Sequence, residues 1–240
     1  MNNVIIMETI YIKSLILFTF VIIGGLLALL LRKNFNNNII SNVLTFSGSF
    51  LLSITITHLI PDLYTKINSN DNCYGQIILL GFCIQLFLEQ FSYGIEHGHL
   101  YNTKKIKPII MLLSLSIHTF FESMPMIYMT NNIVIAIALH HFPASFALST
   151  LFLNNNYKIN FVVTSILIFA ITGPISMFIG QYLHSHLVCN LLIYNNYVLA
   201  ITIGMFLYIS ITILIESSKN HKLNYDKMIS IALGISISLI

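Results

Sequence analysis

Two neighbouring stretches, Ser116–Met124 (SIHTFFESM) and Ala138–Ala147 (ALHHFPASFA), decide how this chain folds. Each lies in the middle of an apolar run that is long enough to cross a bilayer, which takes about 20 residues in a helix. Together they carry three histidines and one glutamate. Ionisable side chains are costly inside a membrane and usually mark a functional site there. These stretches therefore predict membrane-spanning helices that bring a polar site into the bilayer.

The composition of the whole chain also indicates a membrane protein. Of its 240 residues, 56% are hydrophobic and only 8% are charged, whereas a soluble domain carries about 25% charged residues. No basic face or stacking motif of the kind that binds nucleic acid is present in the sequence. We therefore expect an all-α polytopic membrane protein whose partner is the lipid bilayer and not a nucleic acid.

Eight apolar segments predict eight transmembrane helices, with the N- and C-termini both extracytoplasmic. A signal peptide is the alternative for the first segment, although the apolar core of such peptides is usually about 7–15 residues and this segment is longer. The eighth segment is short for a transmembrane helix. We predict helices over residues 9–31, 39–60, 77–96, 107–129, 132–153, 160–183, 197–217 and 228–240, in one domain that takes in residues 1–240.

The basic residues set the orientation, because cytoplasmic loops are enriched in lysine and arginine. With the N-terminus outside, nine of the eleven basic residues fall on the cytoplasmic side, and only Lys13 and Lys66 fall at outer positions. This orientation also supports the eighth helix, since the C-terminus would otherwise lie inside. It places Cys73 and Cys189 on the outer side, where a disulfide between them stays an open alternative.

The histidines of the two central helices fall at matching depths. At 1.5 Å per residue, His118 lies roughly 16 Å from the cytoplasmic start of its helix near Lys107, and His140 roughly 12 Å from the outer start of its helix near Asn132. In a hydrocarbon core about 30 Å thick, both histidines lie near the midplane. His118 and Glu122 are four residues apart and therefore share one face of a helix.

Imidazole and carboxylate side chains in this arrangement suit a transition metal. Zn²⁺ and Fe²⁺ accept nitrogen and oxygen ligands, whereas Mg²⁺ and Ca²⁺ prefer oxygen alone. We predict a site formed by His118, Glu122, His140 and His141 that holds Zn²⁺ or Fe²⁺ as a transported substrate, with no cofactor. A single polar residue in a membrane helix often serves only to hydrogen-bond a neighbouring helix, and that alternative stays open for each residue taken alone.

Two prolines lie close to these side chains. Pro125 and Pro143 lack an amide hydrogen, so each can free the carbonyl four residues back, at Phe121 and Leu139. Bent helices at the midplane are common in transporter sites. Four hydroxyl side chains are candidates to hydrogen-bond the metal ligands directly or to bridge to them through water: Ser116, Thr119, Ser123 and Ser145.

Four motifs, in order and in the corresponding helices, resemble those of the ZIP (Zrt-, Irt-like) metal-ion transporters. The second helix contains FSGSFLLSITITHLIPD, similar to G-x-x-L-x-x-x-x-x-H-L-x-P-D, and the fourth contains HTFFES, similar to H-S/N-x-x-E-G. The fifth contains HHFPAS, similar to H-x-x-P-E-G/A, and the seventh contains GMFLYISITILIE, similar to G-x-F-L-Y-x-x-x-x-E-x-x-x-E. The resemblance implies transport of a divalent metal ion toward the cytoplasm. It also implies a 3+2+3 arrangement of the helices, in which helices 1–3 and 6–8 form an inverted repeat around helices 4 and 5.

The sequence departs from the family pattern at two positions. Ala144 stands where the family usually has a glutamate after the proline, and Ser123 stands where a glycine usually follows the glutamate of the fourth helix. Because the missing glutamate helps to bridge two adjacent metal ions in the family, we expect a single-metal site here. Metal preference and rate stay open.

The resemblance also implies that helices 1, 4, 5 and 6 slide against a scaffold of helices 2, 3, 7 and 8. Gly24-Gly25 and Gly173-Pro174 fit close packing or a helix break in the sliding unit, and ordinary packing of small residues is the alternative. We further expect the plasma membrane rather than an organelle membrane. The oligomeric state stays open, with a homodimer as one alternative.

Polar residues outside the midplane suggest an ion path. His58 and Asp62 are four apart at the outer end of the second helix and form a candidate entrance, with a capped helix end and a local ion pair as the alternative. Glu89, His97 and His99 lie toward the cytoplasmic end of the third helix and form a candidate exit. His97-Gly98-His99 resembles a shortened form of the family's histidine-rich cytoplasmic loop.

Two other classes of function stay open. An intramembrane zinc hydrolase would also bury histidines, but an enzyme needs an activated water and an acid or base beside the metal. All three aspartates lie in or beside loops, and the sequence has no HExxH motif. A structural membrane subunit would bind no metal. We expect a transporter and not an enzyme.

Overall fold

The computed structural model describes residues 3–31, 37–65, 73–92, 108–186, 191–217 and 224–239, and these residues are helical with short turns and contain no strand. Three short segments continue neighbouring helices: the π-helical η1 and the helix α3 after α2, and the 3₁₀-helical η3 after α5. The elements are α1 (Asn3–Leu30), α2 (Asn37–Ile54), η1 (Thr55–Leu59), α3 (Ile60–Thr65), α4 (Tyr74–Ser92), α5 (Pro108–Ser123), η3 (Met124–Tyr128), α6 (Asn131–Asn154), α7 (Ile159–His186), α8 (Leu191–Ser217) and α9 (Tyr225–Ser238).

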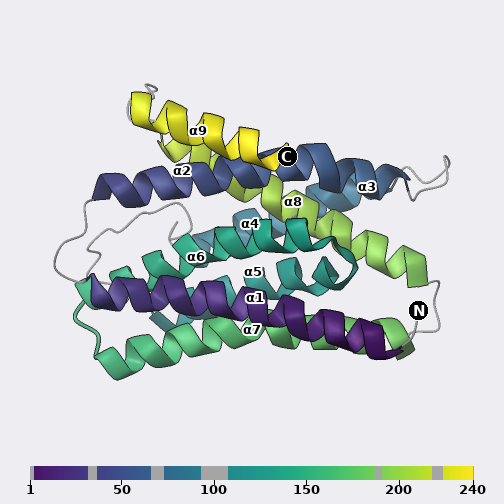
Figure 1. Ribbon diagram of the computed structural model, residues 1–240, viewed down its shortest axis with the longest axis horizontal. Coiled ribbons are helices and arrows are strands. Elements are labelled where there is room, and N and C mark those ends of the chain that lie inside the picture. Colours follow the sequence, from purple (N-terminus) through teal and green to yellow (C-terminus); the bar gives the residue numbers. More distant parts are fainter. Residues whose placement is uncertain are drawn as a thin grey trace.

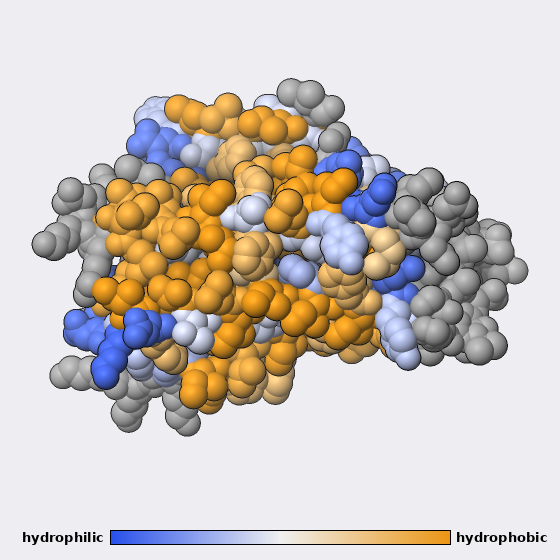
Figure 2. All heavy atoms as spheres, turned by 60° about the horizontal axis from the view of Figure 1, so that its bottom comes forward, coloured by the Kyte–Doolittle hydropathy of each residue, from blue (hydrophilic) through white to orange (hydrophobic). Residues whose placement is uncertain are grey.

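Seven helical segments of the described chain are long and apolar enough to cross a membrane. The eighth predicted helix corresponds to α9, which has 14 residues. A helix of that length extends about 21 Å, whereas a hydrocarbon core is about 30 Å thick. Hydrophobic side chains form a broad band on the face shown in Figure 2, and hydrophilic ones gather toward its two ends. The chain is therefore a multi-pass membrane protein.

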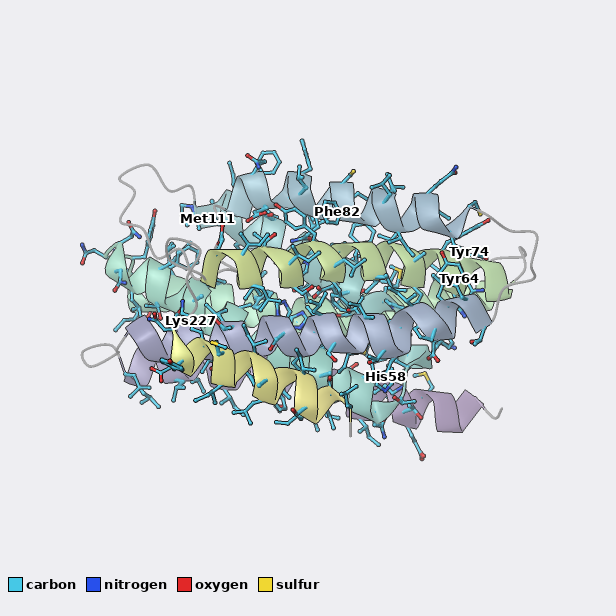
Figure 3. The ribbon with its side chains drawn as sticks, turned by 90° about the horizontal axis from the view of Figure 1, so that it is seen from above. His58, Tyr64, Tyr74, Phe82, Met111 and Lys227 are labelled. Carbon is cyan, nitrogen blue, oxygen red and sulfur yellow. The ribbon has the colours of Figure 1, made fainter. Side chains whose placement is uncertain are left out.

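Both ends of the bundle can be followed in Figure 3. Tyr64 of α3 and Tyr74 of α4 lie at one end, and Lys227 of α9 lies at the opposite end. The predicted orientation assigns the first end to the outside and the second to the cytoplasm. The helices run between these two ends, as expected of a membrane-spanning bundle.

The predicted helices all correspond to observed ones, but several ends differ. The first helix begins at Asn3 rather than at residue 9, and the third begins at Tyr74 rather than at 77. The seventh begins at Leu191 rather than at 197. The sequence hid this start because two asparagines interrupt the apolar run, yet the side chain of Asn196 is buried in the bundle. Residues 93–96, predicted to end the third helix, lie outside the described residues.

The second helix is predicted to end at residue 60, but in the structure it continues to Thr65. The helix widens to a π turn in η1, where the amide of Ile60 donates to the carbonyl of Thr55 five residues back. This wider turn changes the hydrogen-bond register just before Pro61, which has no amide hydrogen to donate. The helix therefore passes the proline instead of ending there.

The two prolines of the central helices act differently. At Pro125 the α-helix gives way to η3 after Ser123, whereas α6 continues through Pro143. The hydroxyl of Thr202 on α8 donates to the carbonyl of Phe121 at 3.1 Å. This is the carbonyl that Pro125 was predicted to free, and a side chain from another helix satisfies it.

The helices pack in two groups (Figure 1). α1 packs along α6 and α7, and α7 packs along α5. We call α1, α5, α6 and α7 the histidine group. α2 packs along α9 and α8, and α4 packs along α8. These four helices form the support group. The two groups meet chiefly where α2 contacts α6 and where α4 contacts α5.

Glycines allow close contacts within the histidine group. A Cβ atom added to Gly24 of α1 would overlap the carbonyl of Phe142 on α6, and one added to Gly173 of α7 would overlap the side chain of Leu17. Helix α7 runs unbroken past Pro174. The predicted role of these glycines in close packing is therefore confirmed, and the predicted helix break is absent from both helices.

A tight turn joins the end of α6 to the start of α7. Asn156 adopts a left-handed conformation with φ of 61°, which asparagine tolerates better than most residues. The amides of Asn156 and Tyr157 donate to the carbonyls of Leu153 and Phe152, both at 3.1 Å. The rings of Tyr157 and Phe152 pack with centroids 5.7 Å apart. The turn is a Schellman motif, and it holds α6 and α7 in the same group.

Lys13 is buried inside the candidate span Met7–Leu30 and not in an outer loop. Its ammonium group donates to the carbonyls of Met126, Ile127 and Met129 at 3.1, 2.9 and 2.7 Å. These carbonyls lie at the C-terminal end of the 3₁₀ segment, where helix carbonyls accept from groups outside the helix, and the carbonyl of Met126 also accepts from the amide of Met129. Lys13 therefore ties α1 to the C-terminal end of the segment that carries His118.

Candidate metal centre

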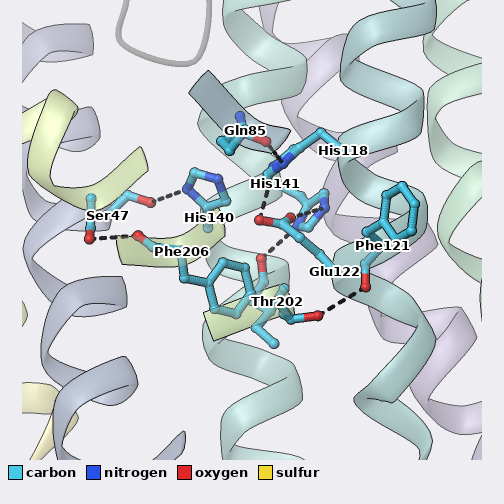
Figure 4. Close-up of polar contacts among 11 residues, drawn as sticks. Ser47, Gln85, His118, Phe121, Glu122, His140, His141, Thr202 and Phe206 are labelled. Atoms are coloured by element: carbon cyan, nitrogen blue, oxygen red, sulfur yellow. Dashed lines mark hydrogen bonds and ion pairs between the residues drawn. The ribbon is translucent and has the colours of Figure 1, made fainter. Parts of the chain in front are cut away.

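The four side chains predicted to hold a metal lie together in the interior of the bundle (Figure 4). Helix α5 supplies His118 and Glu122, and α6 supplies His140 and His141. None of the four is more than 2% exposed. His118, Glu122 and His140 each offer one ligand atom, and these atoms lie within 4.8 Å of one another. The fourth and fifth predicted helices, which are α5 and α6, therefore meet at these side chains.

The carboxylate of Glu122 lies between two of the histidines. Nε2 of His118 is 2.9 Å from Oε1 of Glu122, and Nε2 of His141 is 3.3 Å from Oε2. The first pair is the predicted four-residue spacing on α5, and the second joins α5 to α6. One carboxylate therefore faces imidazoles from both helices.

The remaining ring nitrogens of two histidines are held by acceptors. Nδ1 of His141 is 2.8 Å from the carbonyl oxygen of Ile137, and Nδ1 of His118 is 2.9 Å from Oε1 of Gln85 on α4. Because both partners are carbonyl oxygens, which only accept, each Nδ1 carries the proton. Nε2 of each neutral ring is then the lone-pair nitrogen and faces Glu122, as a metal ligand requires.

The third histidine has a partner on another helix of the support group. Nδ1 of His140 is 3.3 Å from the hydroxyl of Ser47 on α2. Sequence reasoning did not single out Ser47 or Gln85 as functional residues. A signal was present in both cases, since each is a polar side chain in an apolar helix and each is buried. Their pairing with the histidines depends on packing between helices and could not be obtained from spacing.

The centre of the site consists of hydrogen-bond acceptors. Among the described residues, neither carboxylate oxygen of Glu122 has a hydrogen-bond donor, and burying such a charge without a partner is costly. A cation between the carboxylate and the imidazoles would remove this cost. In a tetrahedral zinc site, neighbouring ligand atoms lie about 3.3–3.6 Å apart. The distance of 3.3 Å from His141 to Glu122 fits this range, and the distance of 2.9 Å from His118 falls short by only a few tenths of an ångström.

The position of the missing glutamate is filled by apolar packing. Ala144 lies one turn after His140 on α6 and is buried in a cluster that includes Val21 and Leu148. The four side chains of the site therefore provide a single carboxylate, from Glu122. Two adjacent divalent ions would bring four positive charges against one negative charge in a medium of low dielectric, which is unfavourable. This charge balance favours a single ion.

The hydroxyls predicted to hydrogen-bond the metal ligands do not do so in the described part of the chain. Ser145 donates instead to the carbonyl of Val21 at 2.7 Å and links α6 to α1, so the predicted direct hydrogen bond to a ligand is not formed, and a bridge through water stays a prediction. The buried hydroxyls of Ser116, Thr119 and Ser123 have no hydrogen-bond partner among the described residues. The partners of the histidines come from α2, α4 and the backbone of α6.

The candidate entrance lies at the exposed end of the support group. His58 and Asp62 are both exposed, and no ion pair joins these two described side chains. Nδ1 of His58 lies 2.7 Å from the hydroxyl of Thr57. Cys189 lies outside the described residues, so the structure does not test the disulfide with Cys73 that the sequence left open.

The candidate exit is described only in part. Glu89 of α4 accepts a hydrogen bond from the phenol of Tyr208 on α8, one turn along α4 from Gln85. His97 and His99 lie outside the described residues. Glu89 is thus the one member of the predicted exit that can be placed relative to the metal ligands.

A family model described as ZIP zinc transporter matches residues 95–240. The match covers more than half of the chain and takes in α5 to α9, with all four candidate ligands. None of the curated proteins compared with the sequence matches it.

Proposed function

Because this chain belongs to the ZIP zinc transporter family, we propose that it carries Zn²⁺, and Fe²⁺ as a second substrate, toward the cytoplasm through the site formed by His118, Glu122, His140 and His141. The chain is a divalent metal transporter and not an enzyme. The metal ion is its substrate, and the transport function requires no cofactor.

The observation that carries this proposal is the desolvated cluster of three imidazoles and one carboxylate at the centre of the bundle. Its residues lie inside the candidate spans Pro108–Tyr128 and Ile133–Asn154. The Nε2 atoms of His118 and His141 converge on Glu122, which is an arrangement that binds a borderline-soft cation and offers little to Mg²⁺.

We propose that residues 1–240 form one transmembrane domain with a 3+2+3 arrangement and both termini outside. The packing supports an inverted repeat, because the contact of α1 with α6 has its counterpart in that of α7 with α5. The contact of α2 with α9 likewise has its counterpart in that of α4 with α8. The distribution of basic residues supports the orientation.

The ion path, the membrane and the oligomer are also proposals. We propose entry past His58 and Asp62, whose side chains are exposed, and exit past Glu89, His97 and His99, of which Glu89 lies one turn along α4 from Gln85. The plasma membrane stays a prediction of the sequence, and a homodimer stays one alternative for the oligomeric state.

Uptake of radioactive zinc by liposomes that contain the purified protein tests the function. We expect saturable uptake that excess Fe²⁺ reduces and excess Mg²⁺ leaves unchanged. Liposomes without protein are the control. Uptake no faster than in these control liposomes would contradict the proposal, and equal competition by Mg²⁺ would contradict the role of the imidazoles.

A further inference from the structure

The ligands and their hydrogen-bond partners belong to different groups of helices. His118 and His140 lie on α5 and α6 of the histidine group, whereas Gln85 and Ser47 lie on α4 and α2 of the support group. The hydrogen bonds that orient the two imidazoles therefore cross the boundary between the groups. His141 differs, because its partner is the carbonyl of Ile137 on the same helix.

The hydrogen bond between Gln85 and His118 is the shorter of the two that connect the helix groups. Its amide oxygen lies 2.9 Å from Nδ1 of His118, and its side chain is fully buried. A partner at this position fixes both the orientation of the ring and the nitrogen that carries the proton. Removal of such a partner typically lowers metal affinity about 10- to 100-fold.

We propose that Gln85 is a positioning residue for metal transport, which keeps His118 ready to bind metal only while α4 is packed against α5 as it is in this structure. This inference rests on the proposed function and adds a means of release to it. A hydrogen bond weakens sharply beyond about 3.2 Å, so a shift of about 1 Å between the helix groups breaks the contact. The ring of His118 is then no longer held in place, and the ion is bound less tightly. Ser47, at 3.3 Å from His140, acts in the same way with a smaller effect.

Three substitutions at Gln85 separate positioning from packing. Gln85→Leu keeps the volume and removes the acceptor, and Gln85→Asn keeps an amide but withdraws it by one methylene. Gln85→Glu keeps an acceptor at full reach. Gln76→Leu is the matched control, because Gln76 lies on the same helix with its side chain exposed.

Two measurements test the proposal. Calorimetry gives the zinc affinity of the purified variants, and uptake by liposomes gives their KM and Vmax for zinc. We expect Gln85→Leu and Gln85→Asn to lower affinity about 10- to 100-fold and to raise KM. We expect Gln85→Glu to bind zinc at least as tightly as the wild type but to turn over more slowly, because release is hindered. Should Gln85→Leu fail to fold, the polar Asn and Glu variants carry the same comparison.

Two results would overturn the inference: affinity within twofold of wild type for both Gln85→Leu and Gln85→Asn, or equal loss in the Asn and Glu variants. Either result with normal uptake by the wild type would leave the proposed function intact. Absence of uptake by the wild type itself would instead contradict the proposed function.

Discussion

Helices α5 and α6 carry similar motifs but contribute differently to the metal centre. Both place a histidine inside a candidate membrane span, and in both a proline follows within two turns. On α5 the residue four positions after His118 is Glu122, whereas on α6 the residue four positions after His140 is Ala144. Helix α5 thus provides the charge of the site, and α6 provides two imidazoles, from His140 and His141.

The difference extends to the backbone and to the partner helices. Helix α5 changes to a 3₁₀ segment at Pro125, whose carbonyls bind Lys13, whereas α6 continues past Pro143. The free carbonyl on α5 is taken up by Thr202 of the support group. A repeated sequence motif therefore does not imply repeated chemistry, since the residue one turn beyond the histidine decides which helix neutralises the ion.

The comparison predicts that loss of the α5 carboxylate has the largest effect. Glu122→Ala removes the charge that attracts the ion and leaves three neutral imidazoles, so we expect zinc affinity to fall at least about 100-fold. Calorimetry on the purified variant measures this. The matched control is Leu113→Ala on the same helix, whose side chain is exposed on the surface of the bundle. Equal affinity in Glu122→Ala and in this control would refute the assignment.

The two histidines of α6 are expected to differ from each other. His140 belongs to the compact set with His118 and Glu122, whereas His141 lies outside that set and its Nε2 is 3.3 Å from Oε2 of Glu122. We expect His140→Ala to lower zinc affinity about 10- to 100-fold and His141→Ala to lower it less than about tenfold. Competition binding with a zinc-sensitive dye compares the two. The reverse order would show that His141 is the primary ligand of α6.

Restoring a carboxylate to α6 should make the two helices more alike. Ala144 is buried one turn after His140, so Ala144→Glu adds a second negative charge beside the ion. We expect zinc to bind about tenfold more tightly. The neutral variant Ala144→Gln, which has nearly the same volume, controls for overpacking of the apolar cluster. If the two variants bind zinc equally, position 144 does not line the site.

The smallest expected effect concerns the change from α5 to the 3₁₀ segment η3 after Ser123. Thr202→Val removes the donor to the carbonyl of Phe121, which should cost about 1 kcal/mol of stability. Thermal unfolding in detergent should show a lower Tm with zinc affinity unchanged. A loss of affinity comparable to that of His140→Ala would show that this hydrogen bond shapes the metal centre as well.

The sequence was sufficient to predict the features that depend on local spacing. His118 and Glu122 share a helix face by their four-residue separation, and seven of the eight helices predicted from apolar runs are candidate membrane spans. Matching depth then predicted that α5 and α6 meet. The motifs of these helices also lie within the region matched by the family model.

Features that depend on contacts between helices could not be predicted in this way. Gln85 and Ser47 acquire their roles only because α4 and α2 pack beside the histidines. The burial of Lys13 follows from the 3₁₀ segment across from it. The continuation of the second helix past Pro61 depends on a π turn, which no periodicity indicates.

The central claim is that a metal ion crosses the membrane through the buried site formed by α5 and α6. Its most direct test is the initial rate of radioactive zinc uptake by liposomes that contain equal amounts of folded wild-type protein or Glu122→Ala. The account predicts saturable uptake by the wild type and a rate no higher than that of protein-free liposomes for the variant. Equal rates for the two proteins would contradict it.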